Sequence, residues 1–137
     1  MRILIVEDET IVALSMADTL GEAGHIVVGC AREEGRAMQL AVSARPHLAL
    51  VDLKLARGAS GAVVTWRLRE KFGIASVFVS GSPHDCATVG FQSGALGCLR
   101  KPFKPDELID AVDAAAAIIR RQDPTRIPSN MELYFTT

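Results

Sequence analysis

The sequence predicts a doubly wound α/β sheet, in which parallel strands alternate with helices that cover both faces. Short apolar runs of strand length alternate along the chain with segments of helix length. Residues 48–51 are apolar at successive positions, a pattern typical of a parallel strand buried on both faces. Five strands that alternate with five helices, joined by right-handed crossovers, define this fold class.

The predicted strands are short and mainly apolar, and turn residues separate them from the helices. Their ranges are residues 3–6, 25–30, 48–51, 76–80 and 97–100. Glycine and proline stand at the joints, where turns favour them: Gly24, Pro46, Gly73 and Gly94.

The predicted helices cover residues 10–23, 32–44, 61–72 and 82–93, and a last helix begins at Pro105. Ser82 and Pro83 are suited to the N-cap and the first turn of the fourth helix. Apolar residues at helical spacing predict the buried faces: Val12, Met16, Leu20 and Ala23 in the first helix, Val64, Leu68 and Phe72 in the third, and Leu108, Val112, Ala115 and Ile119 in the last. Ile11 and Leu14 fall on an outward stripe of the first helix.

Composition indicates one folded domain over residues 1–122, followed by a linker-like or disordered tail over residues 123–137. The formal net charge of −1, without clustered basic residues, argues against nucleic-acid binding by this chain alone. No apolar run approaches the roughly 20 residues that span a bilayer, so no membrane association is expected.

The three cysteines are odd in number and have no Cys-x-x-Cys spacing. This pattern favours a reduced, cytoplasmic setting. Cys86 and Cys98 are accordingly predicted to be small apolar core residues rather than redox sensors.

Polar residues follow the predicted strands at the edge of the sheet where ligands bind in such folds. They are Glu7, Asp8 and Glu9 after the first strand, Asp52 after the third, Ser80 at the end of the fourth and Lys101 after the fifth. Glu9 is interpreted as a solvated turn residue. The other three carboxylates, a hydroxyl and an ammonium group are therefore expected to converge at one edge.

Carboxylates crowded in this way repel one another and favour the binding of a cation. An all-oxygen site suits Mg²⁺, which keeps several waters and takes one or two carboxylates together with phosphate oxygens. A carboxylate beside that cation can act as the nucleophile towards a phosphoryl group. Phosphoryl transfer mainly needs positioning and charge stabilisation, which Mg²⁺, Lys101 and Ser80 would supply.

Four blocks of the sequence resemble the signature motifs of response-regulator receiver domains of bacterial two-component systems. They are "ILIVEDE", "LALVDLKL…G…G", "VFVSG" and "GCLRKPF", in the family's order and spacing, over about residues 1–122. The resemblance implies a flavodoxin-like (βα)5 fold with a five-stranded parallel sheet of order 2-1-3-4-5. It also implies a signalling domain that at most catalyses its own phosphotransfer and dephosphorylation.

The resemblance also implies a role for each site residue. Asp52 matches the phosphoacceptor, and Asp8 matches the direct Mg²⁺ ligand, with Glu7 acting on the metal through water. The backbone carbonyl of Lys54 matches a further ligand of the metal. Ser80 matches the hydroxyl that turns towards the phosphoryl group, and Lys101, before a usually cis proline, matches its ion-pair partner. The implied phosphodonor is a histidine kinase or a histidine phosphotransfer protein.

Two positions depart from the common receiver pattern. Cys98 stands where most receivers have Tyr or Phe, so a rotating aromatic side chain is missing there. Ser80 and Gly81 are similar to a subfamily of stand-alone receivers with a Phe-x-Thr-Gly motif, although Ser replaces Thr. The switch is therefore expected in the loop over residues 81–85 and at the start of the fourth helix.

Several functions remain open on the sequence. A stand-alone receiver would act as an adaptor or as a phosphate sink, whereas the chain would be the receiver part of a transcription factor if the natural protein continues. A flavin-binding domain of the same fold would need a Ser/Thr/Gly-rich phosphate loop in place of Glu7, Asp8 and Glu9. A phosphatase with an aspartate nucleophile would need an Asp-x-Asp motif after the first strand, which is absent.

Overall fold

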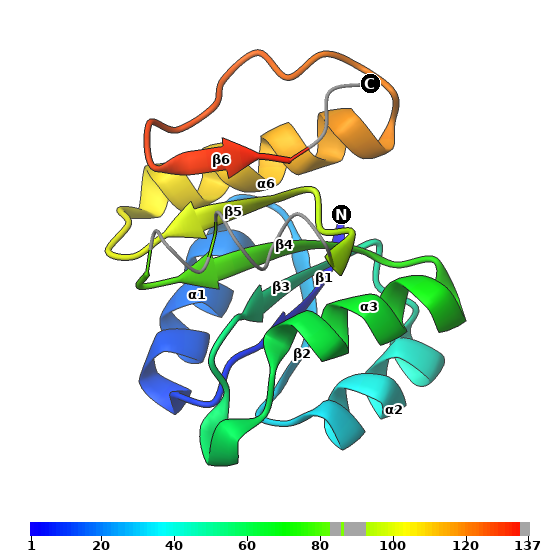
Figure 1. Ribbon diagram of the computed structural model, residues 1–137. Helices are drawn as coiled ribbons and strands as arrows, with labels where there is room; N and C mark the ends of the chain where they lie inside the picture. Colours follow the sequence, from blue (N-terminus) through cyan, green and yellow to red (C-terminus); the bar gives the residue numbers. More distant parts are fainter. Residues whose placement is uncertain (83–85, 87–92, 135–137) are drawn as a thin grey trace.

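The computed structural model describes residues 1–82, 86 and 93–134. It contains a six-stranded sheet in the order β2-β1-β3-β4-β5-β6 (Figure 1). The strands are β1 (Arg2–Val6), β2 (Ile26–Ala31), β3 (Leu48–Asp52), β4 (Ala75–Ser80), β5 (Gly97–Arg100) and β6 (Met131–Leu133). The first five pair in parallel, which confirms the predicted order 2-1-3-4-5, and β6 pairs antiparallel to β5.

Helices cover both faces of this sheet. They are α1 (Thr10–Glu22), α2 (Glu34–Ala44), α3 (Gly61–Phe72) and α6 (Pro105–Ile119), with a short 3₁₀ turn at Ala56–Gly58. α1 packs against α6 on one face, and α2 packs against α3 on the other. Most of the fourth predicted helix, over residues 82–93, lies outside the described residues. Among the described residues, no helix is both long and apolar enough to cross a membrane.

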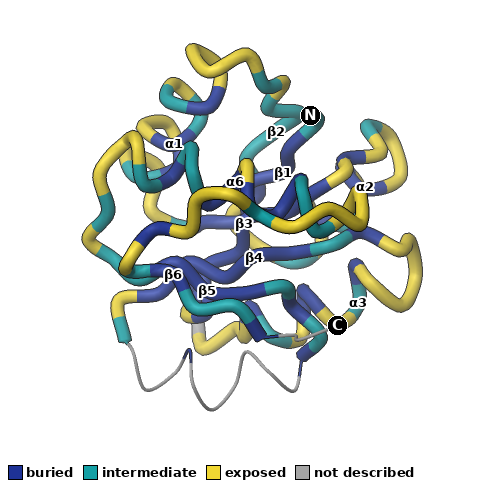
Figure 2. Tube along the Cα trace, turned by 90° about the horizontal axis from the view of Figure 1, so that it is seen from above, coloured by how far each residue is buried: buried dark blue, intermediate teal, exposed yellow. Residues whose placement is uncertain are grey.

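The central strands are buried on both faces because their successive residues enter two different cores (Figure 2). Ala49 and Val51 of β3 pack with residues of α2 and α3. Leu48 and Leu50 pack with residues of α1 and α6. This arrangement explains why residues 48–51 are apolar without alternation.

The predicted helix faces are confirmed along most of their length and fail at the helix ends. The residues confirmed as buried are Met16, Leu20, Val64, Leu68, Leu108, Val112 and Ala115. Ala23 is exposed because α1 ends at Glu22, Val12 is half-buried, and the terminal Phe72 and Ile119 are each 38% exposed. Ile11 and Leu14 face outward as predicted, with 84% and 57% of their surface exposed.

The tail contains a strand that the sequence did not predict. Residues 131–133 form β6, in which Met131 lies opposite Leu99 and is 7% exposed. Tyr134 is also buried and donates its backbone N–H to the carbonyl of Leu96. The prediction of a linker-like or disordered tail is wrong for this segment, because apolar side chains and an unpaired sheet edge hold it in place.

A second correction concerns the cysteines. Cys86 and Cys98 are fully buried in the core, as small apolar residues would be, but they form a disulfide with a Cα–Cα distance of 5.8 Å. Cys30 is free and half-buried. The odd number of cysteines and the lack of Cys-x-x-Cys spacing predicted reduced thiols, but the fold brings together two cysteines that are 12 positions apart in the sequence.

Candidate functional site

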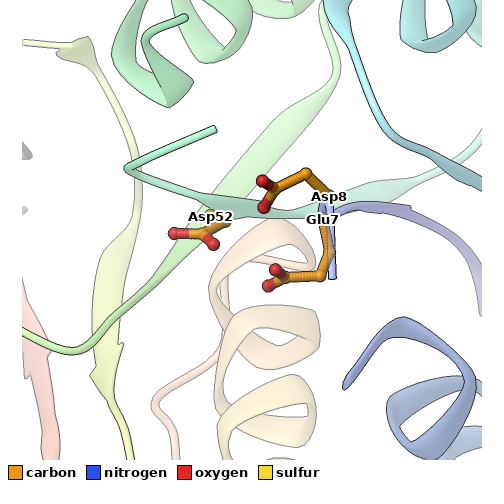
Figure 3. Close-up of side chains that lie close together, drawn as sticks. All are labelled: Glu7, Asp8 and Asp52. Atoms are coloured by element: carbon orange, nitrogen blue, oxygen red, sulfur yellow. The ribbon is translucent and has the colours of Figure 1, made fainter. Parts of the chain in front are cut away.

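Three carboxylates meet at the carboxyl ends of β1 and β3, where the sequence predicted them. Glu7 and Asp8 follow β1, and Asp52 is the last residue of β3 (Figure 3). Each residue offers one carboxylate oxygen, and these three oxygens lie within 4.8 Å of one another. The two strands are neighbours in parallel register, so their ends reach the same point of the sheet edge.

Two of these carboxylates are almost entirely shielded from water. Glu7 is 2% exposed and Asp52 is 8% exposed, whereas Asp8 is half-buried. Burial, and then the negative charge of Asp52, raise the pKa of Glu7 to about 7. The cluster therefore binds a proton or a cation more readily than a solvated group of carboxylates would.

Lys101 supplies a positive charge to the cluster. Its Nζ lies 3.2 Å from Oε2 of Glu7 and 3.5 Å from Oδ2 of Asp52. Burial of the ammonium group opposes its charge, but Asp52 and Glu7 outweigh that effect and raise the pKa of Lys101. The peptide bond between Lys101 and Pro102 is cis, in agreement with the expectation from the resemblance.

The turn after β3 fixes Asp52. The backbone N–H of Lys54 donates to Oδ1 of Asp52 over 3.0 Å, and the N–H of Gly61 donates to the carbonyl of Leu53 over 3.0 Å. A Cβ on Gly61 would overlap the backbone carbonyl of Asp52, so the close approach of α3 requires glycine there. The role of the Lys54 carbonyl as a metal ligand stays a prediction.

Ser80 lies at the end of β4, but among the described residues its hydroxyl bonds to Ser82 rather than to the carboxylates. Among the described residues, its hydroxyl donates to the carbonyl of Ser82 (3.4 Å) and accepts from the Ser82 N–H (3.1 Å). The backbone carbonyl of Ser80 accepts from the N–H of Lys101 (2.8 Å), which joins β4 and β5 at the site. Part of the predicted switch loop, residues 83–85, lies outside the described residues.

A cavity of about 580 Å³ opens beside Asp8 and contains residues that were not predicted to belong to the site. Asp8 lines it together with Arg32 and Arg36, which come from the end of β2 and the start of α2. The position of Arg32 just after a parallel strand was a usable signal, since that edge of the sheet carries the site. The arginines place positive charge in the cavity that Asp8 also lines.

Comparison with known proteins agrees with this geometry. The response regulator receiver domain family matches residues 3–113, and the chain belongs to this family. The chain is 29% identical over 119 residues to the transcriptional regulatory protein PdtaR of Mycobacterium tuberculosis, covering 87% of this chain and 58% of PdtaR. It is 32% identical over 115 residues to the phyllosphere-induced regulator PhyR of Methylorubrum extorquens, covering 83% of this chain and 43% of PhyR. The chain thus spans about half the length of these relatives.

Solved structures share the fold. The signal receiver domain of a modulated diguanylate cyclase from Desulfovibrio desulfuricans superposes with a TM-score of 0.79 at 26% identity, covering 88% of this chain and 96% of that domain. The response regulator PhyR from Brucella abortus gives a TM-score of 0.70 at 29% identity, covering 84% of this chain and 51% of that one. The receiver fold accounts for the order of the first five strands, and β6 is an addition at the edge.

Proposed function

We propose that this chain accepts a phosphoryl group on Asp52 from a histidine kinase or a histidine phosphotransfer protein, and signals through altered protein contacts. The observation that carries the proposal is the convergence of Glu7, Asp8 and Asp52, two of which, Glu7 and Asp52, also contact the ammonium group of Lys101. Such a site belongs to a signalling domain rather than to an enzyme with an external substrate. A cytoplasmic location is proposed with it, since the phosphodonors act there.

The donor set fits Mg²⁺. Three carboxylates share a small volume with a single ammonium group, so the local charge is negative, and oxygen is the ligand that Mg²⁺ prefers. Asp8 and Asp52 would hold the ion directly and Glu7 through water, with the Lys54 carbonyl as a further ligand. When bound, the ion would neutralise charge that develops on the phosphoryl oxygens.

The residues of the chain have separate tasks in this transfer. A carboxylate oxygen of Asp52 forms the new bond to phosphorus while the bond to the donor nitrogen breaks. Lys101, which already contacts Asp52, is placed to bind a phosphoryl oxygen. The Ser80 hydroxyl must leave its bonds to Ser82 to reach the phosphoryl group, and this movement would couple the site to the surface.

The output of the domain is proposed to be protein-protein contact, as an adaptor or a phosphate sink. The net charge of −1 argues against nucleic-acid binding by this chain alone. A role as the receiver part of a longer regulator is a second candidate, because the chain spans only about half of its relatives. The family match and the carboxylates after β1 both disfavour a flavin-binding domain.

The Asp52→Asn variant tests the proposed phosphoacceptor directly. The protein is incubated with Mg²⁺ and a small acyl phosphate or a labelled kinase, and the acid-labile group is mapped by mass spectrometry. We expect labelling of Asp52 in the wild type, none above background in Asp52→Asn, and none in the presence of a chelator. Glu9→Gln, an exposed neighbour of the cluster, is the matched control and should be labelled normally. Undiminished labelling of Asp52→Asn would refute the proposal.

The outward stripe of α1 is expected to contribute to kinase docking. Ile11 and Leu14 are exposed, and Ile11 lines a cavity with Pro102 and Phe103 beside the site. Exposed apolar side chains that meet a partner helix can anchor it. Ile11→Ser with Leu14→Ser should slow phosphotransfer from the kinase about tenfold, the loss expected for one modest anchor.

A small acyl phosphate separates docking from chemistry in the same variant. Its transfer to Asp52 does not need a protein partner, so the double variant should accept phosphoryl from it at the wild-type rate. Val42→Ser, an exposed apolar residue on α2, serves as the control. A folded double variant that takes phosphoryl from the kinase at the wild-type rate would exclude α1 as the dock.

A further inference from the structure

The Cys86–Cys98 disulfide connects two segments that both lead into the site. Cys86 follows Ser80 by six residues, and Cys98 precedes Lys101 by three. The backbone of Cys86 donates to the carbonyl of Ser82, the residue that holds the Ser80 hydroxyl. The disulfide therefore closes a covalent loop between the chain that leaves Ser80 and the strand that arrives at Lys101.

The C-terminal strand and Tyr134 contact the chain beside this disulfide. The Tyr134 hydroxyl donates to the carbonyl of Cys86 over 2.5 Å, and Tyr134 packs in the same core cluster as both cysteines. Cys98 lies opposite Glu132 in the pairing of β5 with β6. A Cβ on Gly97 would overlap the carbonyl of Glu132, so the two strands are in close contact beside the disulfide.

We propose that Cys86 and Cys98 are a reversible thiol–disulfide pair that regulates the candidate site, and that β6 with Tyr134 controls access to it. The proposal rests on the proposed phosphoacceptor function and on its cytoplasmic setting. In that compartment a disulfide is usually transient or redox-sensing rather than structural. Both sulfur-bearing side chains are fully buried, so a reductant reaches them only when the structure around them opens.

Reduction of the disulfide needs a dithiol reductant, which can be a protein with a dithiol pair or a small-molecule dithiol. One of its thiolates attacks Cys86 or Cys98, forms a mixed disulfide and releases the other cysteine as a thiolate. The second thiol of the reductant then resolves the mixed disulfide. Two electrons and two protons pass to the chain, which gains two thiols, and the dithiol leaves as a disulfide. An oxidised dithiol of the same class reverses the reaction.

Among the described residues, the disulfide is the only covalent cross-link between the segment that follows Ser80 and the segment that precedes Lys101. Reduction removes this cross-link. The Ser80 hydroxyl must leave Ser82 to act at the site, so loss of the restraint lowers the barrier to that movement. We therefore expect the reduced chain to exchange its backbone amides at residues 80–82 and 97–101 about tenfold faster. The lifetime of the phosphorylated form should also differ between the two redox states.

The experiment compares the full chain in the oxidised and the dithiol-treated form. Alkylation and mass spectrometry should find one thiol in the oxidised chain, at Cys30, and three after treatment without denaturant. Amide exchange and phosphorylation of Asp52 are then measured in both forms. Cys30→Ser is the matched control and should keep the full redox response, whereas Cys86→Ala with Cys98→Ala should lose it.

The proposed role of β6 and Tyr134 is tested by the rate at which the disulfide is reduced. Tyr134→Phe removes only the hydroxyl that bonds to Cys86, and should speed reduction by about threefold or more, the effect of one lost hydrogen bond. Ile127→Ala, at an exposed position of the same tail, should leave the rate unchanged.

The outcomes separate this proposal from the phosphoacceptor proposal. Three thiols that persist after treatment with an oxidised dithiol, reduction only after denaturation, or identical amide exchange in both redox states would each overturn the redox pair. Absence of labelling at Asp52 in both states, together with a redox-dependent amide exchange, would overturn the phosphoacceptor instead. Because the wild-type chain carries the main comparison, the test stands even if the double alanine variant fails to fold.

Discussion

Replacement of Lys101 by methionine is expected to slow phosphorylation of Asp52 about 100-fold, the usual cost of losing a charged group that stabilises the transition state. Methionine keeps the length of the apolar stem and removes only the ammonium group. That group lies within 3.5 Å of both Glu7 and Asp52, and both carboxylates are buried. The rate with a small acyl phosphate at saturating Mg²⁺ is the measurement, because it needs no docking.

The same variant should be less stable without Mg²⁺. The loss of a partner leaves buried negative charge unpaired, which typically lowers the free energy of unfolding by about 1–3 kcal/mol. Mg²⁺ should then stabilise Lys101→Met more than the wild type, since a divalent cation would neutralise the same carboxylates. Lys71→Met, in the exposed last turn of α3, is the control and should change neither quantity by much. A wild-type phosphorylation rate in Lys101→Met would show that the ammonium group has no part in the transfer.

Replacement of Gly61 by alanine is expected to impair both the fold and the site. The added Cβ would overlap the backbone carbonyl of Asp52 and press on the Cα of Leu53, neither of which can turn away as a side chain would. Such overpacking usually costs about 1–3 kcal/mol in the free energy of unfolding. The shift of Asp52 should also slow its phosphorylation by about tenfold or more, because small displacements of a reacting group are costly.

Gly35→Ala is the matched control for this variant. Gly35 lies in the first turn of α2, and the nearest heavy atom to an added Cβ is a Glu33 side-chain oxygen 3.7 Å away. The change should stabilise the protein by about 0.5–1 kcal/mol through helix propensity and leave the phosphorylation rate unchanged. Chemical denaturation and the small-donor assay measure both effects. If Gly61→Ala matched Gly35→Ala in both assays, the close approach at Asp52 would not constrain the site.

The two variants act on the site through different kinds of interaction. Lys101 acts through charge, so the effect of its replacement on stability should depend on Mg²⁺, which would neutralise the same carboxylates. Gly61 acts through steric contact with the main chain of Asp52, so its effect on stability should be insensitive to Mg²⁺. A comparison of the free energy of unfolding of the two variants with and without Mg²⁺ therefore distinguishes the electrostatic part of the site from its scaffold.

The parallel sheet and the convergence of Glu7, Asp8, Asp52 and Lys101 were predictable from the amino-acid sequence alone. Strand burial follows from local patterns, and the strand order from the resemblance to receiver domains. In a parallel sheet the carboxyl ends of the strands share one edge, so residues far apart in sequence are placed together. The buried faces of the helices were predictable because apolar residues recur at helical spacing. The predicted helix faces are wrong only at helix ends, as at Ala23. The helical period gives the direction in which a side chain points, but it does not give the residue at which the helix ends.

Three other features were not predictable from the sequence and became visible in the folded chain. The strand β6 forms because the free edge of β5 accepts the backbone of residues 131–133, a long-range pairing that the composition of the tail does not encode. The pairing of Cys86 with Cys98 depends on the separation of their Cα atoms in space. The position of Ser80 in the sequence places this serine at the site, but it does not give the direction of the hydroxyl group. In the structure that hydroxyl bonds to Ser82 in the turn after β4.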